Sequence, residues 1–588
     1  MNDDEDSLVA RKPEPGTRTG ASGSSAQGTT GRAALMGWGV FATCWGVAAA
    51  VAVALGRDVN LDLQNYHFYN AYALLEGRWT LDLAAAGMHS FLHPGLDLPY
   101  YLMTRGPLNA WPWLVTALQA GYFGILAFLV LAVANLCCHG DVRRLTWASL
   151  LVALLGLTGV GTLPEAGATQ NDVQIGCLVL GALLSLLLGG TRLGLLAGFL
   201  GGAAIALKLT AAIYALPLAA AALITVQGGP AERLRSVALL ALGGALGFVL
   251  VHGPWGWFLW QHFGNPFGPF FNNFFHSPWF QIENPRDTAF LPQGLAQALT
   301  YPFLWAHRSE WIVIEPQMAD PRFAIGLSAL LVASVAGAWE RLRLGPPADP
   351  ALRDSSDRAA SRATWAVMVF VATAYIAWLL TFSILRYAVA IEMLLGIPVW
   401  AAARSLLDMQ RSRDPMSSGA WRRGAALCVG AVLGVCALVT EYPDHARAGL
   451  GPIRGLRGTV SAAPVALPDG SLVVVAGMYV SFLAPFIAGR DIRFVGATQW
   501  TAGGAWGWTP EWRAAPALGS HRLATESERL IRSYPGPVFV LLDNPDPAEK
   551  GQQLDLSVVQ AFGITFDRGS CQPMVNTISP FGQICRSR

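Results

Sequence analysis

The stretch ALMGWGVFATCWGVAAAVAVALGRDVNLDLQNYHFYNAYALLEGR, residues 34–78, decides the fold of this 588-residue chain. Its first half is an apolar run of about 20 residues, the length that crosses a bilayer as a helix. The run is too long for the core of a signal peptide and lacks an obvious small-residue cleavage site, so we expect it to remain as a membrane anchor. Its second half is acidic and aromatic and begins where the helix leaves the membrane.

The composition of the whole chain indicates a protein that lies mostly in lipid. Hydrophobic residues make up 53% of the chain and charged residues only 13%, with a mean hydropathy of +0.41, whereas about a quarter of residues are charged in soluble domains. Lipid offers backbone amides no partner, so each long apolar run must form a helix. The formal net charge is +2 and no basic stripe is present, which excludes a nucleic-acid binder.

Ten further apolar runs follow the first, so we expect about eleven membrane-spanning helices. If the N-terminus is cytoplasmic, the tail and the cytoplasmic links carry 19 Lys and Arg residues, and the opposite side up to the last span carries 8. This bias predicts a multi-pass protein of the bacterial inner membrane with its N-terminus inside and its C-terminus outside. The expected spans are 35–55, 113–136, 145–163, 173–190, 193–207, 210–226, 236–257, 323–340, 363–383, 387–403 and 424–440.

The predicted organisation has three parts. Residues 1–34 are rich in Gly, Ser, Thr and charge, and we expect a disordered cytoplasmic tail. Residues 35–440 form an all-α membrane module with large extracytoplasmic loops at 56–112 and 258–322. Residues 441–588 form a small periplasmic α/β domain, because Val-rich, strand-like runs alternate there with turns.

Two features of this last part allow alternatives. The apolar stretch 471–489 contains Gly477 and Pro485, which favour a strand, a turn and a short helix over a twelfth span. Cys571 and Cys585 are the only cysteines in the tail, and an oxidising periplasm would allow them to form a disulfide that closes a loop of about 15 residues. The other six cysteines lie in or beside the spans.

The segment after the first span presents two carboxylates, Asp58 and Asp62, at the membrane surface. Transfer of a sugar from a lipid phosphate to a hydroxyl needs a general base for the acceptor proton, and a carboxylate can fill this role. The alternative is that both are merely solvated groups after a helix end. Tyr66 and His67 follow, and their aromatic neighbourhood fits either an interfacial belt or the wall of a sugar pocket.

Two basic side chains lie near the expected outer face, Lys208 between two short spans and Arg386 at the turn between the ninth and tenth spans. Both suit the phosphodiester of a lipid-linked donor, Arg as a bidentate fork and Lys as a point charge. The alternative is that both only extend toward the interface. Glu392 and Asp172 are acids that could pair with such cations.

The aromatic stretch 253–280 is dense in Gly, Pro and Asn, so we expect an interfacial loop over the active cavity and no long regular helix. Together with the first loop it supplies polar groups for a sugar; His89 and His262 lie on the same side. No ligand pair has the diagnostic spacing of a metal site, so no cofactor is required, although a divalent metal remains possible. The substrate-binding candidates are Tyr66, His67, His93, Asp97, Asp172, Asn265, Asn272 and His276.

The setting of the first-loop acid carries a resemblance to a known superfamily. Its residues are Asp62, Tyr66, Leu74, Leu75, Gly77 and Arg78, and shorter matches such as FLHPGLDLPYY (91–101) and LRYAVAIEMLLGIP (385–398) extend it over roughly residues 35–400. This pattern resembles GT-C glycosyltransferases, especially bacterial polyprenyl-phosphate-sugar enzymes of the mannosyltransferase type. The resemblance implies a polyprenyl-phosphate sugar donor, an inverting transfer and a first-loop acid as the base, which assigns that role to Asp62 with Asp58 as runner-up or acidic partner.

The sequence therefore predicts a membrane glycosyltransferase that works on the extracytoplasmic face. Asp62 would deprotonate the hydroxyl of a glycolipid, a lipid-linked glycan or a protein, while Arg386 and Lys208 stabilise the departing phosphate. Two other classes stay open, namely a flippase or transporter for a lipid-linked sugar and a polymerase or ligase of surface polysaccharide. The chain shows no strong internal repeat, which disfavours a transporter, and no Walker loop, which leaves nucleotide-driven chemistry unsupported.

Overall fold

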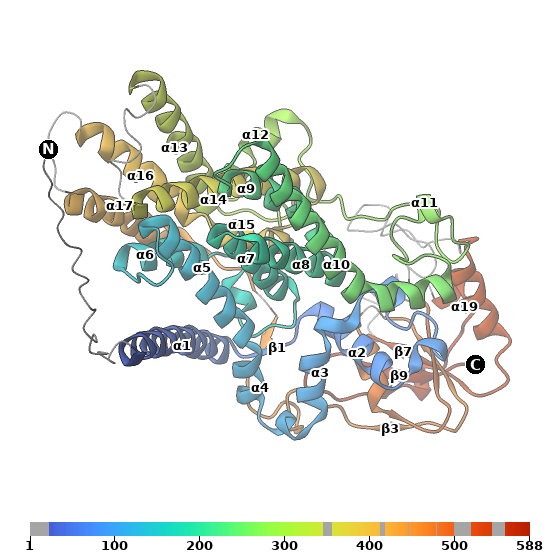
Figure 1. Ribbon diagram of the computed structural model, residues 1–588. Coiled ribbons are helices and arrows are strands. Elements are labelled where there is room, and N and C mark those ends of the chain that lie inside the picture. The colour runs from blue at the N-terminus through green and yellow to red at the C-terminus, as the bar shows by residue number, and fades with distance from the viewer. Residues whose placement is uncertain are drawn as a thin grey trace, which may run out of the picture.

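The computed structural model describes residues 23–344, 355–411, 418–444, 446–477, 479–498, 519–543 and 559–588. Most of these residues are helical, and a small sheet lies near the C-terminal end (Figure 1). The predicted fold class, an all-α membrane protein with a small C-terminal α/β part, is confirmed. Residues 1–22 of the expected tail lie outside the described residues, and α1 (Gly23–Leu55) runs directly into the first predicted span.

Each of the eleven predicted spans coincides with helical structure. Six helices of the described residues are long and apolar enough to cross a membrane, or seven if a pair of helices bent by 43°, Leu385–Glu392 and Gly396–Met409, is one broken span. Four further apolar helices are shorter, at 10–17 residues. The number of spans therefore stays a prediction. The helices concerned are α1, α4 (Pro112–Gln119), α5 (Gly121–His139), α6 (Trp147–Leu157), α7 (Asp172–Leu188), α8 (Thr191–Leu207), α9 (Ala215–Thr225), α10 (Pro230–Phe263), α13 (Arg322–Leu344), α14 (Ser355–Thr381), α15 (Val389–Glu392), α16 (Gly396–Arg411) and α17 (Ser418–Val439).

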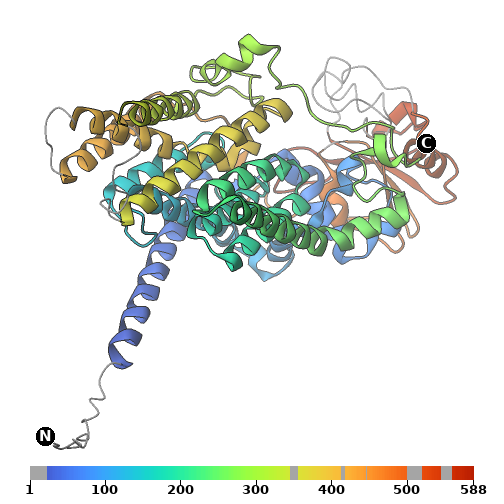
Figure 2. The same cartoon turned by 45° about the horizontal axis from the view of Figure 1, so that its top comes forward.

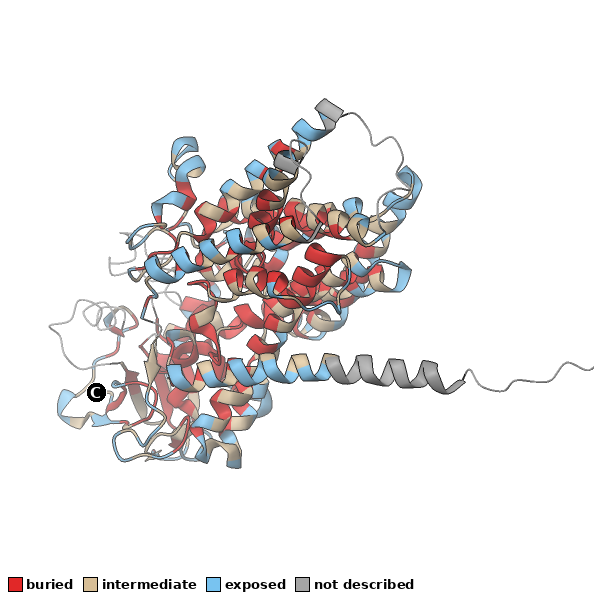
Figure 3. Ribbon diagram, turned by 90° about the vertical axis from the view of Figure 1, so that its left-hand side faces the viewer, coloured by how far each residue is buried: buried red, intermediate tan, exposed pale blue. Residues whose placement is uncertain are grey.

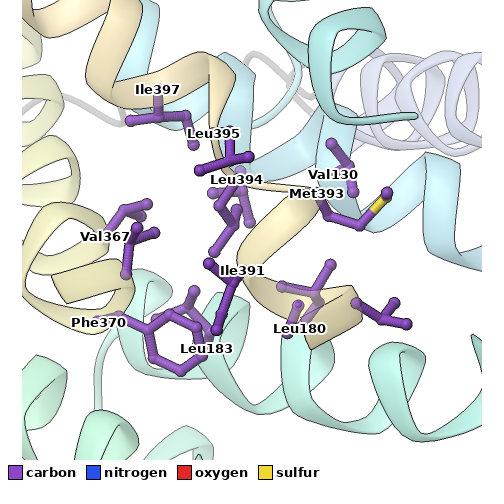
Figure 4. Packing of buried hydrophobic residues seen from close by; sticks show 14 of the residues in the cluster. Val130, Leu180, Leu183, Val367, Phe370, Ile391, Met393, Leu394, Leu395 and Ile397 are labelled. Atoms are coloured by element: carbon purple, nitrogen blue, oxygen red, sulfur yellow. The ribbon is translucent and has the colours of Figure 1, made fainter. Parts of the chain in front are cut away.

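The bundle has one continuous apolar centre, while its outer helices expose apolar side chains. Figure 4 shows Phe370 of α14 and Leu183 of α7 packed around Ile391 of α15. Figure 3 shows buried residues at the middle of the bundle and exposed ones on the outer helices. Helix α1 stands away from the body along much of its length (Figure 2), and Trp38 there is 70% exposed. Such apolar exposure is what a lipid-facing helix requires.

Helices α8 and α10 approach each other at backbone distance because small residues line both. A Cβ atom added at Gly202 would lie 2.0 Å from the carbonyl oxygen of Gly244, and one at Gly247 would lie 2.2 Å from that of Phe199. Close packing through glycine commonly associates helices in lipid. Apolar side chains there gain no hydrophobic free energy by moving from lipid into a helix interface.

The helix of the span predicted over 236–257 extends further, so the expectation of an irregular loop from residue 253 was wrong for residues 253–263. Helix α10 continues through Pro254 to Phe263 and ends at Gly264, whose φ of +65° is a left-handed cap that glycine adopts without strain. A proline is tolerated within a membrane helix because neighbouring groups accommodate the freed carbonyl. The irregular loop begins only after this cap and contains the short α11 (Asn272–Phe275), with α12 (Leu295–Leu304) further along the same link.

The C-terminal part is built around a five-stranded sheet with the order β6-β4-β7-β9-β8. Strand β4 runs parallel to β6 and β7, and β9 runs antiparallel to β7. The bounds are β4 (Leu472–Val475), β6 (Arg493–Gly496), β7 (Val538–Leu542), β8 (Gln572–Pro573) and β9 (Gln583–Arg586). After β4 comes a short helix, η10 (Ser481–Phe486), so the prediction of strand and short helix over a twelfth span is confirmed. The disulfide between Cys571 and Cys585 is confirmed as well.

The first loop and the C-terminal part share one hydrophobic core. Phe68 of the loop is buried in the same apolar cluster as Val473 and Phe482. Strand β1 (Arg57–Asp58) pairs with β2 (Arg447–Ala448), and the buried Arg57 guanidinium donates to the carbonyl oxygens of Gly449, Gly451 and Gly458. Segments almost 400 residues apart in the chain thereby form a single body beside the exit of α1.

A buried arginine ties α13 to the neighbouring helices. The Arg322 guanidinium pairs with Asp320 at 2.9 Å, with both side chains at most 2% exposed, and donates to the Leu155 carbonyl oxygen at 3.0 Å and to the Thr440 hydroxyl at 2.8 Å. These bonds join three segments of the chain.

Replacement of Arg322 by Ala is expected to lower the free energy of unfolding by about 3–5 kcal/mol, because it leaves the Asp320 carboxylate buried without its cation. The matched control is Arg308→Ala, which removes an exposed partner of Glu441, 69% and 41% exposed respectively, and is expected to cost less than about 1 kcal/mol. Denaturant unfolding in detergent measures both. Equal effects of the two substitutions would contradict a structural role for the Arg322 network.

Candidate active site

The first loop begins with a wide helical turn that places Asp62 at its start. The turn, η1 (Leu63–His67), is a π-helix that continues into α2 (Phe68–Leu75). Such turns occur frequently at functional sites. The Asn60 side chain fixes the entry by accepting a hydrogen bond from the Leu63 amide at 2.7 Å.

Asp58 braces this turn and does not face a cavity for substrate. It is 2% exposed and accepts hydrogen bonds from the Asn60 amide at 3.0 Å and from the Thr169 amide and hydroxyl, each at 2.7 Å. A carboxylate whose acceptor positions are occupied in this way is unsuited to take a proton from an acceptor. The structure thus separates the two first-loop acids: Asp58, expected as runner-up for the base or as an acidic partner, is held in hydrogen bonds that fix the turn.

Asp62 follows the exit of α1 and forms an ion pair with Arg386. The Asp62 carboxylate oxygen lies 2.5 Å from an Arg386 guanidinium nitrogen, and the side chains are 23% and 30% exposed. Arg386 belongs to the short helix η9 (Leu385–Ala388) between α14 and α15. The pair is desolvated enough to be strong and open enough to be reached by a ligand.

Lys208 lies against the same aromatic ring as Arg386. The Lys208 ammonium pairs with Asp172 at 2.6 Å and lies 5.0 Å from the centre of the Tyr387 ring, while the Arg386 guanidinium lies 5.4 Å from that centre. A narrow hollow between these groups is lined by Asp172, Arg386, Tyr387 and Tyr214. Two cations, each held by its own carboxylate, therefore lie near one tyrosine ring, and Arg386 and Asp172 both line the hollow beside it.

The histidines of the loop divide into two environments. His67 is buried and its Nδ1 lies 2.6 Å from an Asp97 oxygen, to which Asn171 also donates at 3.0 Å. His89 stacks on Tyr66 with ring centres 5.0 Å apart, and its Nδ1 lies 3.2 Å from the Asn65 amide nitrogen. Tyr66 and His67 also contact each other, at 4.2 Å between ring centres.

These environments shift the pKa values in opposite directions. Burial by itself raises the pKa of Asp62, but the charge of Arg386 and then that of His67 outweigh it and hold this pKa well below its usual range. Burial lowers the pKa of His67, but the charge of Asp97 and its hydrogen bond outweigh burial and raise this pKa above its usual value. Burial lowers the pKa of His89 to about 4. At neutral pH Asp62 is ionised and His89 is neutral.

The remaining predicted contacts lie elsewhere. His93 contacts the Val251 carbonyl oxygen at 3.2 Å and caps its own turn by accepting from the Gly95 amide. Asn265 and Asn272 are fully buried and bond the backbone of their own loop, with Asn272 donating to the Ser277 carbonyl at 2.9 Å, so their interpretation as sugar contacts is corrected. His276 is exposed and bonds the Phe274 carbonyl. The two asparagine side chains therefore stabilise the irregular conformation of their own loop.

The sequence analysis missed three groups at this site. Tyr387 contacts both cations, and its place next to Arg386 was the available signal. Asn171 supports Asp97, and Glu165 is 4% exposed, with burial and the charge of Asp172 raising its pKa well above the usual value. Contacts such as that of Asn171 with Asp97 come from folding, because the partner lies in a distant segment of the chain.

The described residues contain no group of three or more His, Cys, Asp and Glu side chains placed to hold a metal ion. No protein-family model matches the sequence, and a search of curated proteins finds no match. Similar solved structures do exist. ArnT from Cupriavidus metallidurans is 14% identical over 94% of this chain and 98% of its own, with TM-scores of 0.41 bound to undecaprenyl phosphate and 0.42 in the apo state.

A second kind of neighbour is the apo oligosaccharyltransferase of Archaeoglobus fulgidus, 11% identical over 86% of this chain and 69% of its own, with a TM-score of 0.40. At these identities and TM-scores only the overall path of the chain is similar, and the function is judged from the side chains of this chain.

The depressed pKa of His89 makes the stability of the protein depend on pH. Between pH 6.5 and about 4 the unfolded chain binds a proton at His89 that the folded chain does not bind, so the free energy of unfolding falls as the pH falls through this window. The expected contribution is about 3 kcal/mol. Replacement of His89 by Gln removes it, and the variant should lose less stability than the parent between pH 6.5 and 4.5. Parallel pH profiles of thermal unfolding would contradict the assignment.

Proposed function

We propose that this protein transfers a sugar from a polyprenyl-phosphate donor to a hydroxyl acceptor, with Asp62 as the general base and with Arg386 and Lys208 binding the donor phosphate. The observation that supports this most is that the Asp62–Arg386 pair and the Lys208–Asp172 pair place their two cations near one ring, that of Tyr387. The proposal includes inversion at the anomeric carbon, a hexose as the transferred group, and a periplasmic location of the site.

An apolar groove next to the cations supports an amphiphilic donor. It has a volume of about 470 Å³, runs between α8, α9 and α10, and is walled by glycines such as Gly201 and Gly244. Ala211 and Tyr214 line both this groove and the hollow at Arg386. A ligand with a long apolar chain and an anionic head would lie with its chain in the groove and its head at Arg386, where the resting hollow of about 10 Å³ has to widen to admit it.

The resting ion pairs suggest how donor binding activates the base. With Arg386 in place, the Asp62 carboxylate is a weak base, because its pKa lies well below the usual range. A donor phosphodiester competes for the Arg386 guanidinium, which matches phosphate oxygens as a bidentate fork. Loss of this cation raises the pKa of Asp62. Base strength then develops only when the donor is present.

In the proposed transfer step one bond forms at the anomeric carbon and one breaks there. The acceptor oxygen attacks the anomeric carbon, and its proton passes to an Asp62 oxygen. The bond between the anomeric carbon and the phosphate oxygen breaks, and its electron pair remains on the phosphate. Polyprenyl phosphate leaves with one more negative charge than it had in the donor, and Arg386 and Lys208 stabilise that increase.

Replacement of Asp62 by Asn tests the base. It preserves size and hydrogen bonding but cannot accept the proton, so transfer from a synthetic lipid-phosphate sugar in proteoliposomes is expected to fall by about 10²–10⁴-fold in kcat. The matched control is Glu76→Gln, an exposed acid of the same loop, which should stay within about twofold of the parent. Turnover of Asp62→Asn close to that of the control would overturn the assignment.

Replacement of Lys208 by Met tests the donor site separately. The change removes the cation that pairs with Asp172 beside the hollow, leaves Asp62 in place, and is expected to raise the KM for the lipid-phosphate donor by at least about tenfold. The KM for the acceptor should change little. A rise confined to the acceptor KM would place Lys208 at the acceptor and contradict its role toward phosphate.

Release of free polyprenyl phosphate separates the transferase from the other two classes. A transferase releases it in proportion to the sugar transferred. A flippase releases none, and a polymerase acting on lipid pyrophosphates releases the pyrophosphate form. Thin-layer analysis of the lipid products in the same proteoliposomes distinguishes these outcomes.

A further inference from the structure

A second cavity lies at the end of the bundle opposite the Asp62–Arg386 pair. It has a volume of about 640 Å³ and is enclosed by α13, α14, α16 and α17, near the C-terminal ends of α13 and α16 and the N-terminal ends of α14 and α17. Small residues keep the space open on one side, namely Ala333, Gly337 and Ala401. None of its lining residues belongs to the site proposed for sugar transfer.

Two arginines and three tryptophans define the inner part of this cavity. The Arg404 guanidinium lies 5.0 Å and the Arg422 guanidinium 5.2 Å from the centre of the Trp421 ring. Trp400 lies 6.3 Å from Trp421 between ring centres, and Trp365 also lines the space. Both arginines are about a quarter exposed, so each keeps donors accessible from the cavity. Planar guanidinium groups held on an aromatic ring are suited to bind phosphate oxygens.

Three carboxylates share the lining with these arginines. Asp357 pairs with Arg422 at 2.8 Å, Asp408 lies 3.7 Å from Arg404, and Glu340 is exposed. The five groups carry two positive and three negative formal charges. A ligand that is only anionic would bring its charge close to three carboxylates, whereas a ligand with both a phosphate and an ammonium group complements the whole lining.

The surroundings favour a lipid over a soluble molecule. Helix α13 exposes apolar side chains in the turns beside the cavity, with Val335 60%, Trp339 58% and Leu342 84% exposed. Exposed tryptophan at the end of a membrane helix is typical of the interface between lipid and water. Acyl chains could therefore follow α13 while the head group enters between the helix ends.

We propose that this cavity binds the head group of a zwitterionic phospholipid that carries a primary amine, with its phosphate on Arg404 and Arg422 and its ammonium on the carboxylates of Glu340, Asp357 and Asp408. A primary ammonium donates hydrogen bonds to carboxylates. A quaternary ammonium has no N–H group and cannot donate these bonds. The inference is independent of the sugar-transfer site.

Native mass spectrometry of the full chain, stripped of lipid in detergent, tests the proposal. The protein is titrated with phosphatidylethanolamine, phosphatidylcholine and phosphatidylglycerol of identical acyl chains, and with soluble phosphoethanolamine. Phosphatidylethanolamine is expected to bind at least about fivefold more tightly than the other two lipids. Soluble phosphoethanolamine should displace it only at a concentration at least about a hundredfold higher, because it lacks the acyl chains.

Variants locate the binding. The double substitution R404A/R422A is expected to reduce phosphatidylethanolamine binding at least about fivefold, whereas Arg423→Ala, which removes a neighbouring exposed arginine outside the cavity, should leave it unchanged. Ser361→Trp fills the cavity without removing a charge and should have the same effect as the double substitution. It also decides the question if R404A/R422A fails to fold.

Three results would overturn the proposal. The first is equal binding of phosphatidylglycerol or phosphatidylcholine by the parent protein, because the carboxylates would then not select an amine. The second is unchanged phosphatidylethanolamine binding in Ser361→Trp. The third is displacement by phosphoethanolamine at a concentration comparable to that of the lipid, which would assign the cavity to a soluble ligand.

Discussion

The ion pair between Asp62 and Arg386 joins two parts of the chain that lie 324 residues apart. It holds the exit of α1 against the turn that precedes α15, and those two segments form opposite walls of the site. The two charges stabilise each other at this partly desolvated position, where the Asp62 and Arg386 side chains are 23% and 30% exposed. The arrangement of the outer end of the bundle therefore depends on this contact, with Asp58 and Asn60 fixing the turn on one side and Tyr387 lying against the cation on the other.

The body beside the exit of α1 is built from two segments that a linear division of the chain would separate. The first loop buries its aromatic residues against the C-terminal sheet, and Arg57 bonds three carbonyl groups of the segment that follows the last span. The sheet thus supports the π-helical turn that carries Asp62 at its start. A change in the C-terminal part can alter the site through this shared core without contacting a substrate.

The two ends of the bundle use charge differently. At the end that carries Asp62 each cation is held by one carboxylate and lies near the Tyr387 ring, and Arg386 lines a narrow hollow beside an apolar groove. At the other end two arginines lie on Trp421 in a wider space that three carboxylates also line. Helix α14 and the α15–α16 pair run from the first region to the second, so the same helices support both.

Much of the fold followed from the sequence, because lipid leaves an apolar run no other option than a helix. Every predicted span coincides with helical structure, and the strands at 472–475 and 538–542 were located from their Val-rich runs. The start of the irregular loop was placed too early, because the aromatic, Gly, Pro and Asn content of 253–280 predicted an irregular segment, whereas α10 continues to Phe263. Local pattern also indicated Asp62, Lys208 and Arg386 as notable charges at the outer face, since ionisable groups at membrane depth are costly.

Tertiary structure alone decided which charges meet. Asp58 and Asp62 are four residues apart and look equivalent in sequence, yet one is enclosed by Thr169 and Asn60 and the other faces Arg386. The asparagines of the loop after α10 have the polar character of sugar-binding groups, but in the folded protein their side chains bond the backbone of their own loop. Hydropathy is a property of each segment and can be read along the chain. A pair of charges is a relation between segments, and it exists only once the packing of distant helices has brought them within a few ångströms of each other.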